Sequence, residues 1–399
     1  MLTRFFPAFK YKNYRIFFAG QSVSLIGTWM QMVAQGYFVF QLTGSAYLVG
    51  LTAAIGQLPA TFFSLIAGTI VDKFPKKSIL QITNALSFVL AATLGVAIIS
   101  GNIDIVSLTI FAFLMGLVNS VSQPARIASI ADLVDKQDIR AATAMNMAMF
   151  NSARIIGPAI AGWLILAFGV GWAYLVNGLT FLAPLIAFQF INFRPHIKLP
   201  HQSTFNAIKE GLSYAKNHAL IKYLLLYLGI ISIFGWSYTT ILPVISERVF
   251  AQGPSGLGLL FSAAGAGSVA GAIFVSAFTE KLNAKKLILI GGLLFSFNLL
   301  LFAQTENFYL ALPLLFLAGF GLTAQNANIQ AAIQHSVEDR VRGRVVSIQT
   351  LMLMGLHPIG SFQIGLIAEN MGSQFAVAVG AVVVLLSALL LFWKTPKHN

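Results

Sequence analysis

A stripe of hydrogen-bonding side chains runs through residues 15–40, one of the apolar parts of this sequence. Its members are Gln21, Ser24, Thr28, Gln31 and Gln35. Their spacing puts them within an arc of about 80° on one helix face. Unpaired polar groups are costly in hydrocarbon, so this face needs a partner. Of these residues, Ser24, Thr28, Gln31 and Gln35 are our candidates for the lining of a solute cavity, with hydrogen bonding between helices as the alternative.

Two titratable side chains lie inside apolar segments. A mid-helix arginine costs about 2.5–3.5 kcal/mol, so Arg154 should face a cavity or a structural partner, and it could attract an anionic group of a substrate. His357 is a candidate proton carrier because an ordinary histidine pKa is about 6.5. A lone histidine before Pro358 also fits a packed helix kink. All twelve acids lie in loops or at helix ends.

Further amides and aromatic rings recur on other apolar segments. The candidates for contact with a solute are Asn119, Asn151, Trp236, Gln325 and Asn328. These groups suit a neutral or mildly amphipathic molecule better than a highly charged one. The chain has no cysteine and only six scattered histidines, so we expect no disulfide, no metal site and no cofactor.

The composition is that of a protein that lies in lipid. Of the 399 residues, 57% are hydrophobic and only 9% are charged, whereas a soluble domain carries about 25% charged residues. Apolar runs of about 20 residues predict transmembrane helices. We expect twelve, near 15–40, 46–71, 78–100, 105–125, 143–165, 171–192, 221–243, 255–278, 286–303, 308–333, 345–368 and 372–393.

The basic residues predict the orientation of these helices. All but two of the 25 lysines and arginines fall at the termini and in the even-numbered connections, the exceptions being Arg154 and Arg248. This asymmetry predicts that both termini are cytoplasmic. It also accounts for the net charge of +13 without nucleic acid as a partner. We therefore expect a multi-pass protein of a bacterial cytoplasmic (inner) membrane.

An internal repeat divides the chain into two halves. DKFPKKSIL (72–80) resembles EKLNAKKLI (280–288), and Arg140 precedes Pro158 by the same separation as Arg340 precedes Pro358. We expect an N-terminal six-helix half at 1–192 and a C-terminal half at 221–399. Between them, 193–220 reads as a linker with an amphipathic helix on the cytoplasmic membrane surface. The expected fold class is an all-α membrane protein with two pseudo-symmetric halves.

Two motifs resemble those of the major facilitator superfamily, and the resemblance covers the whole chain in helix count and loop placement. GTIVDKFPKK (68–77) is similar to its loop signature through Gly68, Asp72, Lys73, Lys76 and Lys77, with Pro75 in place of the usual glycine. RIIGPAIAG (154–162) is similar to the signature of the antiporters of the superfamily through Gly157, Pro158 and Gly162. SQPARIASIADLV (122–134) and 343–372 resemble the branch with the enterobactin-exporter-like and macrolide-efflux-like proteins.

The resemblance implies alternating access of a central site to the two sides of the membrane. In such a mechanism Asp72 could pair with Arg126, or cap a helix of the other half, and hold the cytoplasmic side closed. Lys73, Lys76 and Lys77 could take part in holding the cytoplasmic side closed. Alternatively, they only reflect the excess of positive charge on the cytoplasmic side of membrane proteins. Many proton-coupled transporters use buried carboxylates, and their absence here weakens the case for proton antiport.

Other functions fit the sequence less well. AAGAGSVAG (263–271) lies inside an apolar helix, so Gly267 and Gly271 predict close helix packing rather than a dinucleotide loop. No Walker A sequence, nucleophile–base pair or channel filter is present. We expect that the protein is not an enzyme but a secondary transporter that exports a siderophore-like or drug-like small molecule. We expect it to be a monomer, and protons are the candidate coupling ion. The alternatives are an importer of a small metabolite, a lipid flippase and, least favoured, a membrane-embedded enzyme.

Overall fold

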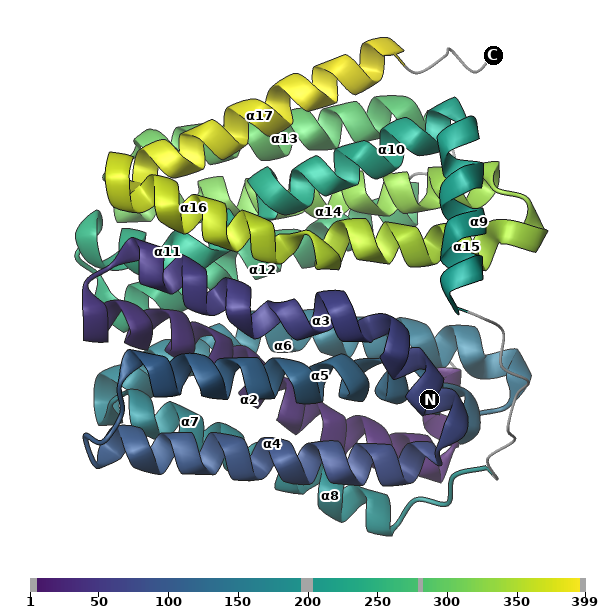
Figure 1. Cartoon of the computed structure of the whole chain (residues 1–399), viewed down its shortest axis with the longest axis horizontal. Helices are drawn as coiled ribbons and strands as arrows, with labels where there is room; N and C mark the ends of the chain where they lie inside the picture. The colour runs from purple at the N-terminus through teal and green to yellow at the C-terminus, as the bar shows by residue number, and fades with distance from the viewer. Residues whose placement is uncertain (1–5, 195–203, 279–282, 395–399) are drawn as a thin grey trace. The chain divides into compact units, whose positions relative to one another are not determined.

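The computed structural model describes residues 6–194, 204–278 and 283–394, and every regular element in these ranges is helical (Figure 1). The predicted all-α class is confirmed. It follows from the solvent, because a helix satisfies its backbone hydrogen bonds within one segment, as hydrocarbon requires.

The elements in residues 6–194 cover the first six predicted spans. They are η1 (Pro7–Lys10), α2 (Lys12–Thr43), α3 (Ala46–Lys73), α4 (Lys76–Ile99), α5 (Ile105–Leu133), η2 (Lys136–Asp138), α6 (Ile139–Phe168), α7 (Val170–Thr180) and α8 (Leu182–Gln189).

The remaining elements cover the predicted linker helix and the last six spans. They are α9 (Thr204–Asn217), α10 (Ala219–Ile230), η3 (Ile231–Trp236), α11 (Tyr238–Arg248), α12 (Gly253–Phe278), α13 (Ala284–Gln304), α14 (Phe308–Ser336), α15 (Asp339–Thr350), η5 (Leu351–Gly355), α16 (His357–Met371) and α17 (Ser373–Lys394).

Eleven of the described helical segments are long and apolar enough to cross a bilayer. The predicted span 15–40 is not among them. It lies within α2, whose 32 residues reach about 48 Å and so exceed the hydrocarbon thickness. Its stripe of glutamine, serine and threonine lowers the mean hydropathy of this helix, which therefore differs from the others in polarity and not in length.

Several predicted spans differ from a single regular α-helix. The span 171–192 divides at Phe181 into α7 and α8. The π-helical turns η3 and η5 interrupt the spans 221–243 and 345–368. Helix α5 continues past residue 125 to Leu133, because the polar residues of its last turns interrupt the apolar run but not the helix.

The chain forms two compact units. One comprises residues 1–38 and 55–201, and the other comprises 39–54 and 202–399. Residues 39–54 hold the end of α2 and the start of α3, and their contacts are with the second unit. Within that unit Arg248 donates to the Gly44 carbonyl at 2.5 Å, and the Tyr47 N–H donates to Glu369 at 3.1 Å. The predicted boundaries at 192 and 221 stay a prediction.

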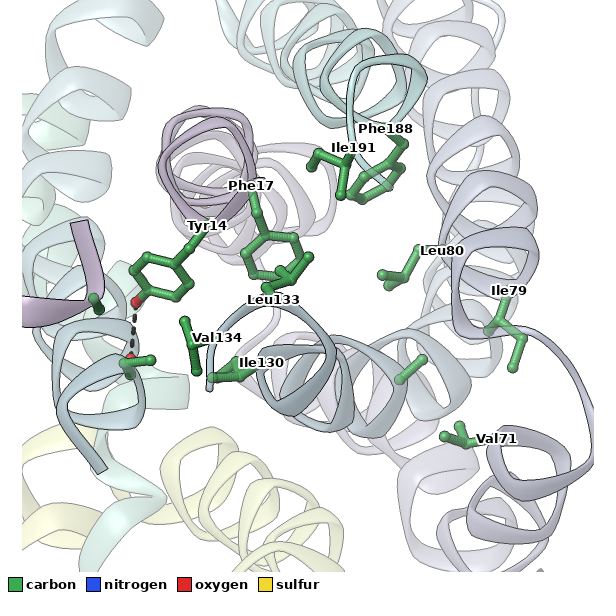
Figure 2. Packing of buried hydrophobic residues seen from close by; sticks show 13 residues of the cluster. Tyr14, Phe17, Val71, Ile79, Leu80, Ile130, Leu133, Val134, Phe188 and Ile191 are labelled. Carbon is green, nitrogen blue, oxygen red and sulfur yellow. Dashed lines mark hydrogen bonds between the residues drawn. The ribbon is translucent and has the colours of Figure 1, made fainter. Parts of the chain in front are cut away.

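The core of the first unit is a cluster of buried apolar side chains from α2, α3, α4, α5, α6 and α8 (Figure 2). Phe17 lies against Phe188, with ring centroids 6.3 Å apart. The Tyr14 hydroxyl donates to the Ala142 carbonyl at 2.8 Å, which ties α2 to α6. This cluster fixes the relative positions of the helices that carry most of the candidate residues of the first unit.

In the second unit, α12 and α14 approach closely through glycine. A Cβ at Gly267 or Gly271 would collide with the backbone of Phe316 or Phe320, and one at Gly319 would collide with the backbone of Ala264. The predicted close packing at Gly267 and Gly271 is confirmed. Such small-residue contacts replace the hydrophobic effect as a source of helix association in lipid.

The predicted linker helix corresponds to α9, which packs along α15. Gly211 lies against Arg344, and Glu210 forms an ion pair with Arg344. Ala215 is buried whereas Leu212 is 55% exposed. This packing gives α9 a protein partner, and its placement on the membrane surface stays a prediction.

Candidate functional site

The polar stripe of α2 is largely buried inside the first unit. Ser24 and Gln31 are buried, and Gln35 is partly exposed. Gln31 accepts a hydrogen bond of 2.5 Å from the Asn177 side chain on α7. The Thr28 hydroxyl donates to the Ser24 carbonyl at 2.9 Å. In this structure Gln31 therefore contacts another helix, and a role of the stripe in solute binding stays a prediction.

Arg154 lies near the middle of α6, beside an aromatic pair. Its guanidinium carbon is 5.7 Å from the centre of the Trp29 ring, and Trp29 makes an edge contact with Phe150 at 5.5 Å. Arg154 is partly exposed. Cation–π contacts contribute about 0.5–2 kcal/mol, so this contact offsets part of the cost of placing a charge in the middle of a membrane-spanning helix. It also puts a cation beside a flat apolar surface.

One face of α5 carries polar side chains toward its C-terminal end. Asn119 is partly buried, Gln123 is exposed and Arg126 is only 7% exposed. The Nη1 atom of Arg126 is buried without a hydrogen-bond partner among the described residues. The expected pairing of Asp72 with Arg126 is wrong for this structure, because no ion pair joins them and Asp72 is exposed at the end of α3.

The lysines of the loop motif contact α5 and the end of α8 instead. Lys76 forms an ion pair with Asp132 at 2.8 Å, and both side chains are partly buried. Lys77 donates to the Ile191 carbonyl at 3.2 Å. Lys73 is exposed, and Gly68 has open space at its Cβ position. Lys76 and Lys77 thus hold the first unit together, and a gating role for the motif stays a prediction.

The motif on α6 provides close packing against α2. A Cβ at Gly157 would collide with Trp29 and with the Ile26 carbonyl. Pro158 and Gly162 are buried inside α6. These small and rigid residues bring α6 close enough to α2 for Arg154 to lie over Trp29.

In the second unit, Trp236 and His357 meet beside two interrupted helices. Their ring centroids are 5.4 Å apart in an edge contact. Nδ1 of His357 is 3.3 Å from the Ser361 hydroxyl, which is 3.0 Å from the Thr240 hydroxyl. Trp236 ends the π-helical turn η3, and His357 follows the π-helical turn η5. Such turns occur often at functional sites.

The hydroxyl of Ser232 joins these two π-helical turns. It donates to the Leu353 carbonyl at 2.7 Å. A π-helical turn shifts the backbone hydrogen-bond pattern, so this carbonyl is accessible to a side chain of another helix. The bond therefore ties the positions of Trp236 and His357 to each other.

Three other predicted residues use their amides for contacts within the protein. Asn151 and Asn328 donate to the carbonyls of Met147 and Ala324 on their own helices. Gln325 is fully buried and accepts a hydrogen bond of 2.8 Å from Tyr227. These contacts are structural in this conformation, and solute binding by these residues stays a prediction.

Sequence reasoning missed the partners of these groups. Asn177 bonds Gln31, Tyr227 bonds Gln325, and Ser361 lies beside His357. The sequence feature that could have pointed to Asn177 as a partner is its amide side chain within an otherwise apolar segment. The signals for Tyr227 and Ser361 were weaker, because tyrosine and serine are common in transmembrane helices.

An ion-pair network fastens the N-terminal segment to the connection between α5 and α6. Lys10 pairs with Asp138 at 2.7 Å, and the Tyr11 hydroxyl donates to Asp138 at 2.6 Å. The hydrogen bond to Asp138 raises the pKa of Lys10. Arg194 pairs with Asp135 at 2.8 Å. No group of three potential metal ligands occurs among the described residues.

Comparison with known proteins adds a family and relatives. The sequence model of the family described as transmembrane secretion effector matches residues 3–398. The chain is 26% identical over 362 residues to the staphyloferrin A transporter of Staphylococcus aureus, covering 90% of each chain. It is 19% identical over 393 residues to macrolide efflux protein A of Streptococcus pyogenes, covering 96% of each. A bacterial homologue of the human lysosomal transporter Spinster shares the fold, with a TM-score of 0.77, 14% identity and 96% of each chain covered.

The hydrogen bond between Gln31 and Asn177 predicts the result of a double-mutant cycle. Gln31→Leu or Asn177→Leu alone should destabilise the protein by about 1–3 kcal/mol, because each leaves a buried amide unpaired, and the double variant should be less harmful than the sum. Thermal unfolding in detergent measures this coupling. Additive effects, together with weaker solute binding in Gln31→Leu alone, would show that Gln31 serves the solute and not the helix pair.

Proposed function

Because the chain belongs to the transmembrane secretion effectors, a family of the major facilitator superfamily, we propose that it exports a small amphipathic molecule, siderophore-like or drug-like, by alternating access. The predicted superfamily is confirmed, and the chain is a multi-pass membrane transporter of small molecules. The names of two relatives support the class of cargo, since one is a staphyloferrin A transporter and the other a macrolide efflux protein.

The observation that carries the proposal is the contact between Arg154 and Trp29. Arg154 lies fifteen residues after the start of α6 at Ile139, which corresponds to about 22 Å along a helix of about 45 Å. Helix α6 contains no acidic residue. A cation beside an aromatic ring at this depth suits a molecule that has both an anionic group and an apolar or aromatic part.

The proposal predicts what a deletion strain retains. We expect one compound to accumulate inside deletion cells and to appear in the medium of complemented cells, in cultures grown with and without iron. Comparative metabolite profiles of cells and medium measure this. A compound left unused in the medium of the deletion strain would indicate an importer, and a changed lipid distribution without a trapped solute would indicate a flippase.

The same assay tests Arg154. Complementation with Arg154→Gln should reduce release by about tenfold, which corresponds to the loss of one charged contact. The matched control is Lys285→Gln, because Lys285 also lies over an aromatic ring, that of Phe392 at 4.9 Å, but at the start of α13. Equal release from both variants at equal protein levels would exclude the proposed role of Arg154.

We further propose that protons drive export and that His357 carries them. The support is the position of His357 beside Trp236 and Ser361. Because the interior of the predicted spans holds no acid, a proton carrier there cannot be a carboxylate. In proteoliposomes an imposed pH gradient should accelerate transport, and His357→Gln should remove this dependence while solute binding remains. The exposed His335 supplies the control His335→Gln. Gradient-independent transport by the unaltered protein would rule out proton coupling.

The charge distribution supports a protein of the bacterial cytoplasmic membrane with both termini inside, and we propose that it is a monomer. The chain has no cysteine, so single cysteines report topology without background. In intact cells an impermeant maleimide should label Ser100→Cys, after α4, but not Gly343→Cys, in α15. The reverse labelling pattern would show that both termini lie outside the cytoplasm. A mass in detergent equal to that of two chains would contradict the proposed monomer.

A further inference from the structure

Four buried side-chain atoms of the first unit have no hydrogen-bond partner among the described residues, and they belong to Gln21, Arg126, Asn146 and Tyr174. The atoms of Arg126 and Asn146 are complementary in their chemistry. Arg126 on α5 is 7% exposed and Asn146 on α6 is 3% exposed. The unmatched atom of Arg126 is Nη1, a charged donor, and that of Asn146 is Oδ1, an acceptor. A buried group left unpaired costs about 1–3 kcal/mol, and more when it is charged. A charged donor and a neutral acceptor that are both unpaired in one unit can be satisfied by one ligand.

The topology places both residues at the same depth. Arg126 lies seven residues before Leu133, where α5 ends, and Asn146 lies seven residues after Ile139, where α6 begins. At 1.5 Å per residue, each is about 10 Å from the short connection between the two helices.

Both residues lie close in sequence to members of the same buried cluster. Ala125, next to Arg126, belongs to this cluster, and so does Ala142, one turn before Asn146. Met145 packs against it as well. The cluster therefore brings the segments that carry the charged donor and the neutral acceptor to one region between α2, α5 and α6.

The acids of the first unit do not supply the missing anion. Asp132, Asp135 and Asp138 form ion pairs with lysine or arginine. Asp104 caps α5 by accepting a 2.8 Å hydrogen bond from the Ser107 N–H, which lowers the pKa of this carboxyl. Asp72, the remaining acid of this unit, is exposed and makes no ion pair among the described residues. The counter-charge of Arg126 must therefore come from outside this unit.

The neighbouring face of α5 carries polar side chains that are not buried. Gln123, one turn before Arg126, is exposed, and Asn119, a further turn away, is partly exposed. Polar amides on a membrane-spanning helix need water or a solute rather than lipid tails. The buried charge thus lies at the end of a polar face that a hydrated molecule can approach.

We infer that Arg126 and Asn146 form a binding site for a solute that carries an anionic group beside a hydrogen-bond donor, such as a carboxylate next to a hydroxyl. Nη1 of Arg126 donates to the anion, and Oδ1 of Asn146 accepts from the hydroxyl. This assignment rests on the proposed transport function and narrows its cargo. It also gives Arg126 a role in substrate recognition instead of the expected pairing with Asp72.

Three related probes test the two contacts separately. Mandelate has a carboxylate beside a hydroxyl, phenylacetate lacks the hydroxyl, and mandelamide lacks the charge. The full chain in lipid nanodiscs should bind mandelate about tenfold more tightly than either relative, as expected for one good polar contact. The measurement is the rise of the thermal unfolding temperature with probe concentration.

Variants then assign the contacts. Arg126→Gln should weaken mandelate binding to the level of mandelamide, and Arg126→Lys should restore part of it. Asn146→Leu should remove the difference between mandelate and phenylacetate. The controls are Arg194→Gln, an exposed arginine of the same unit, and Asn84→Leu, a buried asparagine whose amide bonds its own helix; both should bind as the unaltered protein does.

The outcomes separate this site from the export proposal. Equal binding of the three probes, or unchanged selectivity in the Arg126 and Asn146 variants at full folding, would overturn the site and leave a buried water or a direct side-chain contact as the partner. Export of a trapped compound would then still support the export proposal. Selective binding by a chain that releases nothing from cells would support the site and overturn export.

Discussion

The demand that polar groups find partners in hydrocarbon underlies every feature of this structure. Backbone groups meet it by forming helices, and most buried side chains meet it by bonding a carbonyl one turn away or an amide on a neighbouring helix. The bonds of Asn177 to Gln31 and of Tyr227 to Gln325 are of this second kind. These four side chains already bond to one another. Buried polar groups that have no partner in the protein are therefore the ones that point to a ligand.

This constraint also separates framework from candidate site. Gly157, Gly267 and Gly271 allow backbones to touch, and the pair of Lys76 with Asp132 ties α4 to α5. None of these contacts needs a solute. Arg126 and Asn146 are different, because nothing within their unit completes their hydrogen bonding. A protein that moves a solute needs residues that stabilise each unit and residues whose hydrogen bonds are completed only when a solute binds.

Hydropathy, charge placement and glycine spacing were enough to predict the all-α class, the twelve helical segments and the close packing at Gly267. They could not predict where a segment is interrupted, because the π-helical turns at Ile231–Trp236 and Leu351–Gly355 depend on packing against other helices. Side-chain partners were also beyond reach. The stripe of α2 predicts that Gln31 needs a partner, but only the fold shows that Asn177 supplies one.

The grouping of residues 39–54 with the second unit has a consequence for how the two units are tethered. The backbone passes from one unit to the other near Val39, again near Ala54, and a third time near Gln202. The first two passages lie inside continuous helices, α2 and α3. An N-terminal fragment that ends after α8 would therefore still carry residues 39–54 of the second unit, because α2 and α3 each contain residues of both units.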